Sequence, residues 1–114
     1  FVVDNPNVPK VLPISATELK ALADSGRPFV LVDVRTPQER AVARIEGSRL
    51  LDEASYPELL TLDRDAPLVF QCHHGIRSQA AAEHFVREGF RNVFNLEGGI
   101  DAWSTMVDPG VPRY

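Results

Sequence analysis

The segment "CHHGIR", residues 72 to 77, gathers most of the residue types in this chain that could do covalent chemistry. It holds the only cysteine, two of the three histidines, a glycine and an arginine. Nearby cations and backbone N–H groups lower the pKa of a thiol and increase its nucleophilic thiolate fraction. We therefore interpret Cys72 as a reactive thiol, although a lone cysteine is more commonly a buried structural residue.

The segments on either side of this loop predict how it is held. The run "PLVFQC" (67 to 72) is apolar and β-rich, which predicts a buried strand. Downstream, the apolar residues at 81, 82, 85 and 86 share one face of a predicted helix that Gly89 ends. The loop thus leads into a helix N-terminus, where free N–H groups and the helix dipole favour an anion. Gly75 lets the backbone turn tightly so that successive amides converge, and Arg77 adds positive charge.

The rest of the chain predicts an α/β domain. Short β-rich runs occur at 29 to 34, 48 to 52 and 92 to 96. Helix starts are indicated by capping-box spacing after Ser15, Thr36 and Ser55. Alternating strands and helices favour a central, mostly parallel sheet flanked by helices, a three-layer arrangement in which ligands bind at the carboxyl ends of the strands. Cys72 lies at such an end.

Composition limits the functions to consider. The 114 residues are 44% hydrophobic and 25% charged, which suits one globular domain. The net charge of −4 and the scattered basic residues give no attraction to nucleic acid or to an anionic membrane, and no stretch is long and apolar enough for a membrane span. A single cysteine favours a reducing compartment, so we expect a cytoplasmic protein. Because the chain begins with Phe1, we expect a processed product or a piece of a longer protein.

Metal and cofactor chemistry is not expected. Cys72, His73 and His74 are consecutive, so their side chains should diverge, and only His84 remains as a further imidazole. Asp33 and Arg35 follow a buried strand and precede a helix cap, which indicates a structural ion pair that supports neighbouring loops. We therefore expect no metal site and no cofactor.

Three motifs in the right order resemble the rhodanese-type sulfurtransferases. "CHHGIRS" is similar to the family's active loop, Cys-x-x-Gly-x-Arg/Ser-Ser. "FVLVDVRTPQERAVARIEGS" (29 to 48) resembles its Asp-x-Arg-x-x-x-Glu stretch that runs to Ile-x-Gly, and "GFRNVFNLEGGIDAW" (89 to 103) resembles its Leu-x-Gly-Gly-x-x-x-Trp segment. One departure is Arg44, where many members have histidine; we expect it to affect local packing. The resemblance covers roughly residues 14 to 104.

This resemblance implies a function and a set of roles. Cys72 would take a sulfur atom from thiosulfate or a related small anionic donor as a persulfide and pass it to an external thiol or protein acceptor. The active-loop residues would form an anion cradle around it, with Arg77 as electrostatic support and Asp33 and Arg35 supporting the loop from behind. The cradle residues are His73, His74, Gly75, Ile76, Arg77 and Ser78.

Two alternatives stay open. Phosphatases or arsenate reductases of similar design place five residues between the cysteine and the arginine, whereas four separate Cys72 from Arg77, so that reading is disfavoured. A non-catalytic rhodanese-like binding or regulatory module is the other, although such modules typically lose the cysteine that this chain keeps.

The chain divides into three parts. Residues 1 to 13 predict a linker or N-terminal remnant, 14 to 106 the rhodanese-like domain, and 107 to 114 an extended C-terminal tail packed on the surface. "FVVDNPN" weakly resembles a segment of A-type iron–sulfur scaffold proteins. We therefore expect sulfur to be delivered to a fused or partner redox or iron–sulfur module.

Overall fold

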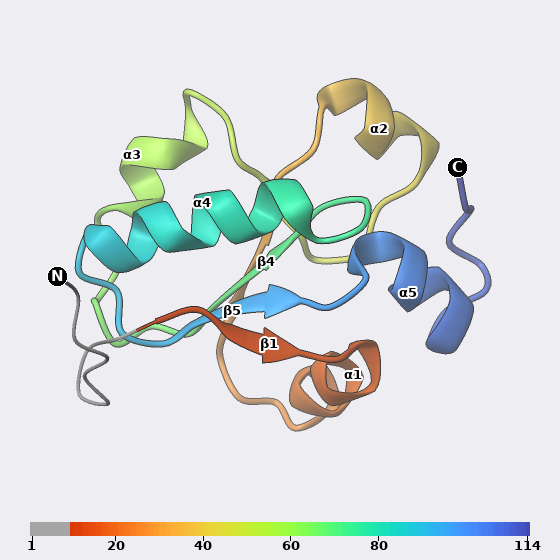
Figure 1. The fold of residues 1–114 in the computed structure, drawn as a ribbon, viewed down its shortest axis with the longest axis horizontal. Coiled ribbons are helices and arrows are strands. Elements are labelled where there is room, and N and C mark those ends of the chain that lie inside the picture. Colours follow the sequence, from red (N-terminus) through yellow and green to blue (C-terminus); the bar gives the residue numbers. More distant parts are fainter. Residues whose placement is uncertain (1–9) are drawn as a thin grey trace, which may run out of the picture.

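The computed structural model describes residues 10–114 and confirms the α/β architecture (Figure 1). Five parallel strands form one sheet in the order β1-β5-β4-β2-β3. The elements in chain order are β1 (Leu12–Ile14), α1 (Ala16–Asp24), β2 (Val30–Asp33), α2 (Pro37–Val42), β3 (Arg49–Leu50), α3 (Ser55–Leu59), β4 (Leu68–Gln71), α4 (Ile76–Arg87), β5 (Val93–Leu96) and α5 (Gly99–Met106).

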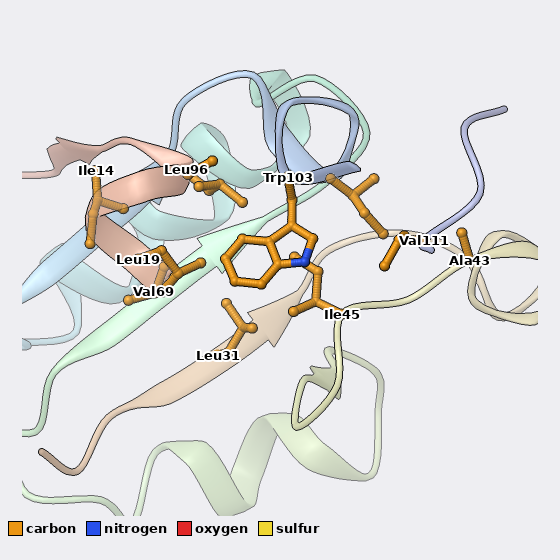
Figure 2. Packing of buried hydrophobic residues seen from close by; sticks show 11 residues of the cluster. Ile14, Leu19, Leu31, Ala43, Ile45, Val69, Leu96, Trp103 and Val111 are labelled. Atoms are coloured by element: carbon orange, nitrogen blue, oxygen red, sulfur yellow. The ribbon is translucent and has the colours of Figure 1, made fainter. Parts of the chain in front are cut away.

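Helices cover both faces of the sheet because successive strand residues point to opposite sides. Val69 packs in a cluster with residues of α1 and α5, whereas the next residue, Phe70, packs with residues of α3 and α4. Figure 2 shows Trp103 of α5 at the centre of the first cluster, with Leu31 of β2 beside it. Trp103 therefore belongs to the core, and its exposed fraction is 8%.

Two of the three predicted helix caps are confirmed. Ser15 and Thr36 each accept a hydrogen bond from the backbone N–H three residues on, and the glutamate at that position bonds back to the cap N–H. The prediction for Ser55 is wrong. There the Asp52 carboxylate accepts from the N–H groups of Ala54 and Ser55, at 3.0 and 2.8 Å, because a charged acceptor is the stronger cap. In the described part of the chain, each helix falls short of what a bilayer-spanning segment requires.

The two ends of the chain contribute more to the fold than expected. Leu12 and Pro13, within the segment 1 to 13 assigned to a linker or remnant, lie in β1, an edge strand where a proline is tolerated. The segment "FVVDNPN" lies outside the described residues. At the other end, Val111 is buried in the cluster around Trp103 (Figure 2), so the tail runs back over the domain.

Candidate active site around Cys72

Cys72 lies where the parallel strands end and the helices begin. It follows the last residue of β4, and the loop of residues 72 to 75 leads directly into α4. Gly75 is the N-cap of α4 with φ +109°, a left-handed conformation that other residues rarely adopt. The predicted loop between a buried strand and a helix N-terminus is therefore present as a tight turn around the thiol.

Hydrogen-bond donors surround the sulfur atom of Cys72. The N–H groups of Gly75 and Ser78 donate to Sγ at 3.1 and 3.4 Å, and the Ser78 hydroxyl lies 3.3 Å from it. Burial raises the pKa of the thiol, but the hydrogen bonds from Ser78, Gly75 and His74 outweigh it and lower the pKa overall. The hydrogen bonds thus favour the thiolate form of Cys72, whose side chain is buried at 1% exposure.

Asn95 of β5 holds this loop in place, and the sequence analysis did not single it out. Its Nδ2 donates to the carbonyl oxygen of Gly75 at 3.0 Å, and its Oδ1 accepts from the Ser78 hydroxyl at 2.5 Å. The Ser78 hydroxyl has one proton, so Asn95 Oδ1 and Cys72 Sγ compete for it. The backbone N–H groups of Gly75 and Ser78, in contrast, donate to Sγ alone. A polar residue inside the otherwise apolar strand β5 (Val93–Leu96) was the available signal.

Gly99 brings α5 against the back of the active loop. At the start of α5, the N–H of Ile100 donates to the carbonyl oxygen of Cys72 at 2.8 Å. A Cβ at position 99 would overlap the carbonyl oxygens of Cys72 and His73, and φ is +60°. Gly99 therefore lets the start of α5 pack closely against the backbone of the active loop, whereas a Cβ at Gly98 would overlap Ala102 of the same helix.

Asp33 and Arg35 form the expected buried ion pair. Arg35 donates to the two carboxylate oxygens of Asp33 at 2.8 Å each, and both side chains are fully buried. Arg40 of α2 donates to the same carboxylate at 2.9 Å. Arg35 also bonds to the carbonyl of Ala43 at 2.7 Å. The pair thus anchors α2 and the segment after it beside the active loop.

Arg77 points toward α2. Its guanidinium makes a bidentate salt bridge with Glu39, with N–O distances of 2.7 and 3.0 Å. The Tyr114 hydroxyl donates to Glu39 Oε2 at 2.6 Å and accepts from Arg35 Nη1 at 3.0 Å. From the sequence, Glu39 was a capping residue and the last residue of the Asp-x-Arg-x-x-x-Glu stretch, and Tyr114 lay in a surface tail. Neither assignment predicted these bonds, because contacts across 38 and 75 residues leave no local signal.

The two loop histidines lie against each other rather than diverging. The ring of His73 lies between those of His74 and Tyr114, with centroid distances of 4.0 Å on each side, and it stacks almost parallel to Tyr114. The expectation that these side chains diverge was therefore wrong, and ligand atoms of His73, His74 and Asp101 lie within 4.8 Å of one another. Arg113 Nε already forms a salt bridge with Asp101 Oδ1 at 2.8 Å, so a metal ion bound by Asp101 would have to displace Arg113.

We call the group formed by His73, Glu39, Arg77 and Tyr114 the rim. Ile76, at the first position of α4, is 82% exposed beside it. The six predicted cradle residues thus separate in the structure: the backbone of Gly75 and Ser78 contacts the sulfur, while the side chains of His73 and Arg77 belong to the rim.

Comparison with known proteins is consistent with this geometry. A family model described as "Rhodanese-like domain" matches residues 15–106. Thiosulfate sulfurtransferase GlpE of Pseudomonas aeruginosa is 39% identical over 94 residues, covering 82% of this chain and 84% of that protein. GlpE of Ectopseudomonas mendocina is 42% identical over 91 residues, covering 79% and 82%. A crystal structure of a rhodanese-like domain protein from Staphylococcus aureus matches with a TM-score of 0.73 and 28% identity, covering 91% of this chain and 99% of that one. This chain therefore belongs to the rhodanese-like domain family.

Proposed function

We propose that Cys72 is the sulfur carrier of this chain, a rhodanese-type sulfurtransferase that uses thiosulfate or a related donor. The observation that carries the proposal is the ring of donors on Sγ: two backbone N–H groups and one hydroxyl at 3.1 to 3.4 Å. Such a ring stabilises a thiolate before the reaction and a persulfide anion after it. The activity named for the two GlpE relatives supports the choice of thiosulfate.

The transfer has two balanced steps. In the first, the Cys72 thiolate attacks the outer sulfur of thiosulfate, so that an Sγ–S bond forms, the S–S bond of the donor breaks, and sulfite leaves with the electron pair. In the second, an acceptor thiolate or cyanide attacks the outer sulfur of the persulfide, and Cys72 leaves as a thiolate. Because the chain has no second cysteine, the acceptor is an external thiol or a protein, and a fused or partner redox or iron–sulfur module is the class of protein we propose.

The remaining loop residues have supporting roles in this proposal. The backbone of residues 73 to 78 stabilises the anionic groups, and the loop side chains, His73, His74 and Ile76 among them, border the path that a donor takes. Arg77 lies in the rim as one half of a salt bridge with Glu39. Asp33 and Arg35 hold α2 against the loop. A reactive free thiol functions only where it stays reduced, and we propose the cytoplasm on that ground.

Intact-protein mass spectrometry tests the proposal. The chain and a Cys72→Ser variant are incubated with thiosulfate and then with cyanide. We expect a mass gain of one sulfur atom in the unchanged chain alone, reversed by cyanide with release of thiocyanate. The absence of any gain with thiosulfate and organic thiosulfonates would overturn the proposal and favour a non-catalytic binding module. Phosphate release from an aryl phosphate that Cys72→Ser abolishes would favour the phosphatase alternative.

A further inference from the structure

The cation of the active loop is neutralised by a residue of another element. Both terminal nitrogens of Arg77 bond to the Glu39 carboxylate, at 2.7 and 3.0 Å. Arg77 is 45% exposed and Glu39 19%, so the pair lies at the surface of the site, where a donor arrives. A donor therefore meets the field of a salt bridge, in which the charges of the two groups largely cancel, rather than the field of a free guanidinium.

Two further contacts fix Glu39 in this position. Its Oε1 accepts from the N–H of Thr36 at 3.2 Å, as part of the capping box of α2, and its Oε2 accepts from the Tyr114 hydroxyl at 2.6 Å. These bonds, with the bond from Arg77 as the largest influence, hold the pKa of Glu39 far below its usual range. The carboxylate is therefore ionised throughout the neutral pH range and its charge is a constant feature of the rim.

Donors of sulfane sulfur differ in charge but share the reacting group. Thiosulfate is a dianion and releases sulfite, whereas an organic thiosulfonate, RSO2S⁻, is a monoanion and releases a sulfinate. In both reactions the Cys72 thiolate forms a bond to the outer sulfur and the electron pair of the broken S–S bond leaves with the sulfonyl group. A fixed negative charge on the rim opposes an arriving dianion about twice as strongly as an arriving monoanion.

We infer that Glu39 is a specificity-determining residue, which cancels the charge of Arg77 and shifts the donor preference from doubly charged thiosulfate toward singly charged thiosulfonates. The inference rests on the proposed persulfide chemistry and adds to it a residue outside the active loop. Tyr114 acts through Glu39 as a positioning residue, since its hydroxyl orients the carboxylate that faces Arg77.

The test compares two donors in two forms of the protein. Values of kcat/KM for thiosulfate and for methanethiosulfonate are measured with cyanide as acceptor, for the unchanged chain and for Glu39→Gln. Glutamine also serves at this position of a capping box, so α2 keeps its N-terminal hydrogen bonds. We expect the ratio of thiosulfate to methanethiosulfonate kcat/KM to rise by up to roughly fivefold, the upper limit being the effect of one unit charge at about 4 Å in a water-like dielectric. The gain should shrink at high ionic strength.

A matched control removes the same charge far from the site. Glu88 is exposed and follows the last residue of α4, at the opposite end of this helix from the active loop. The helix has 12 residues, which corresponds to about 18 Å. Glu88→Gln should leave the donor ratio unchanged. If Glu39→Gln leaves it unchanged as well, or lowers both kcat/KM values equally, the inference is overturned and Glu39 is only a structural residue.

The opposite charge change gives an independent readout. In Arg77→Gln the carboxylate of Glu39 is no longer compensated, so the donor ratio should fall below that of the unchanged chain. The double variant Glu39→Gln/Arg77→Gln should return toward the original ratio. A ratio that moves in the same direction in both single variants would also overturn the inference. If neither donor adds sulfur to the unchanged chain, the proposed function itself fails, which the mass measurement detects separately.

Discussion

The two parts of the active site, the backbone turn of residues 72 to 78 around Sγ and the side chains of the rim, are built in different ways. The turn holds Sγ with backbone N–H groups from positions three and six residues after Cys72. The rim joins Glu39 and Tyr114, which are 75 residues apart, to Arg77. The turn thus depends on local backbone conformation, whereas the rim depends on side chains that the whole fold brings together.

This difference separates two properties of the enzyme. Backbone groups cannot be changed by most substitutions and carry no net charge, so they suit the thiolate and persulfide that any donor produces. Side chains of the rim can change charge and size without disturbing the turn. We therefore expect changes in the turn to affect whether the reaction occurs, and changes in the rim to affect which donors are used.

The largest effect should come from the contact that supports the turn. Gly99→Ala would place a Cβ into the carbonyl oxygens of Cys72 and His73 at φ +60°. We expect a loss of about 3 kcal/mol or more in the free energy of unfolding, since backbone overlap adds to the cost of a left-handed conformation. Urea unfolding monitored by Trp103 fluorescence measures it.

Gly26→Ala is the matched control for this substitution. Its φ is +77° but nothing lies within 4 Å of a Cβ there, so the cost should be only about 1 to 2 kcal/mol. Equal losses at the two glycines would show that the contact with the turn contributes nothing beyond backbone conformation.

A smaller effect is expected inside the turn. Ser78→Ala removes the hydroxyl that lies 3.3 Å from Sγ, so the pKa of Cys72 should rise and less thiolate should be present at neutral pH. The rate of persulfide formation at pH 7 should fall by about threefold to tenfold, and the rising limb of its pH profile should move to higher pH.

Ser104→Ala is the control, because Ser104 is a buried serine of α5 whose hydroxyl has no partner in the described part of the chain. It should leave the profile in place. If Ser78→Ala also leaves it in place, the backbone N–H groups alone lower the pKa of Cys72, and the Ser78 hydroxyl donates to Asn95 instead. That outcome would sharpen the distinction between backbone and side-chain roles.

The lowered pKa of Cys72 also links stability to pH. Because the thiol ionises more readily in the folded than in the unfolded protein, its contribution is fully present above the ordinary thiol pKa and is lost as pH falls through the lowered value. The free energy of unfolding should therefore rise with pH across this window in the unchanged chain more than in Cys72→Ser. Identical slopes would contradict the lowered pKa.

The same local and long-range division explains what the sequence could predict. The strands, the caps at Ser15 and Thr36 and the turn around Cys72 follow from residues within a few positions of one another. The cap at Ser55 was wrong because Asp52 competes for the same N–H groups. Asn95 and Tyr114 were missed because their partners in the site, 17 to 79 residues away, are defined only once the sheet and tail have packed.

The smallest effect should come from Tyr114. Tyr114→Phe keeps the stack on His73 but loses the hydroxyl bonds to Glu39 and Arg35. Because the ring is 41% exposed, we expect a loss of only about 0.5 kcal/mol in the free energy of unfolding, with a donor ratio that moves slightly in the direction of Glu39→Gln.

Tyr114→Ala should cost about 0.5 to 1.5 kcal/mol more, since it also removes the stack. Urea midpoints and the two-donor assay check both variants. Equal costs for the two variants would mean that the stack adds no stability, and an unchanged donor ratio would mean that the capping box and Arg77 position Glu39 without the tail.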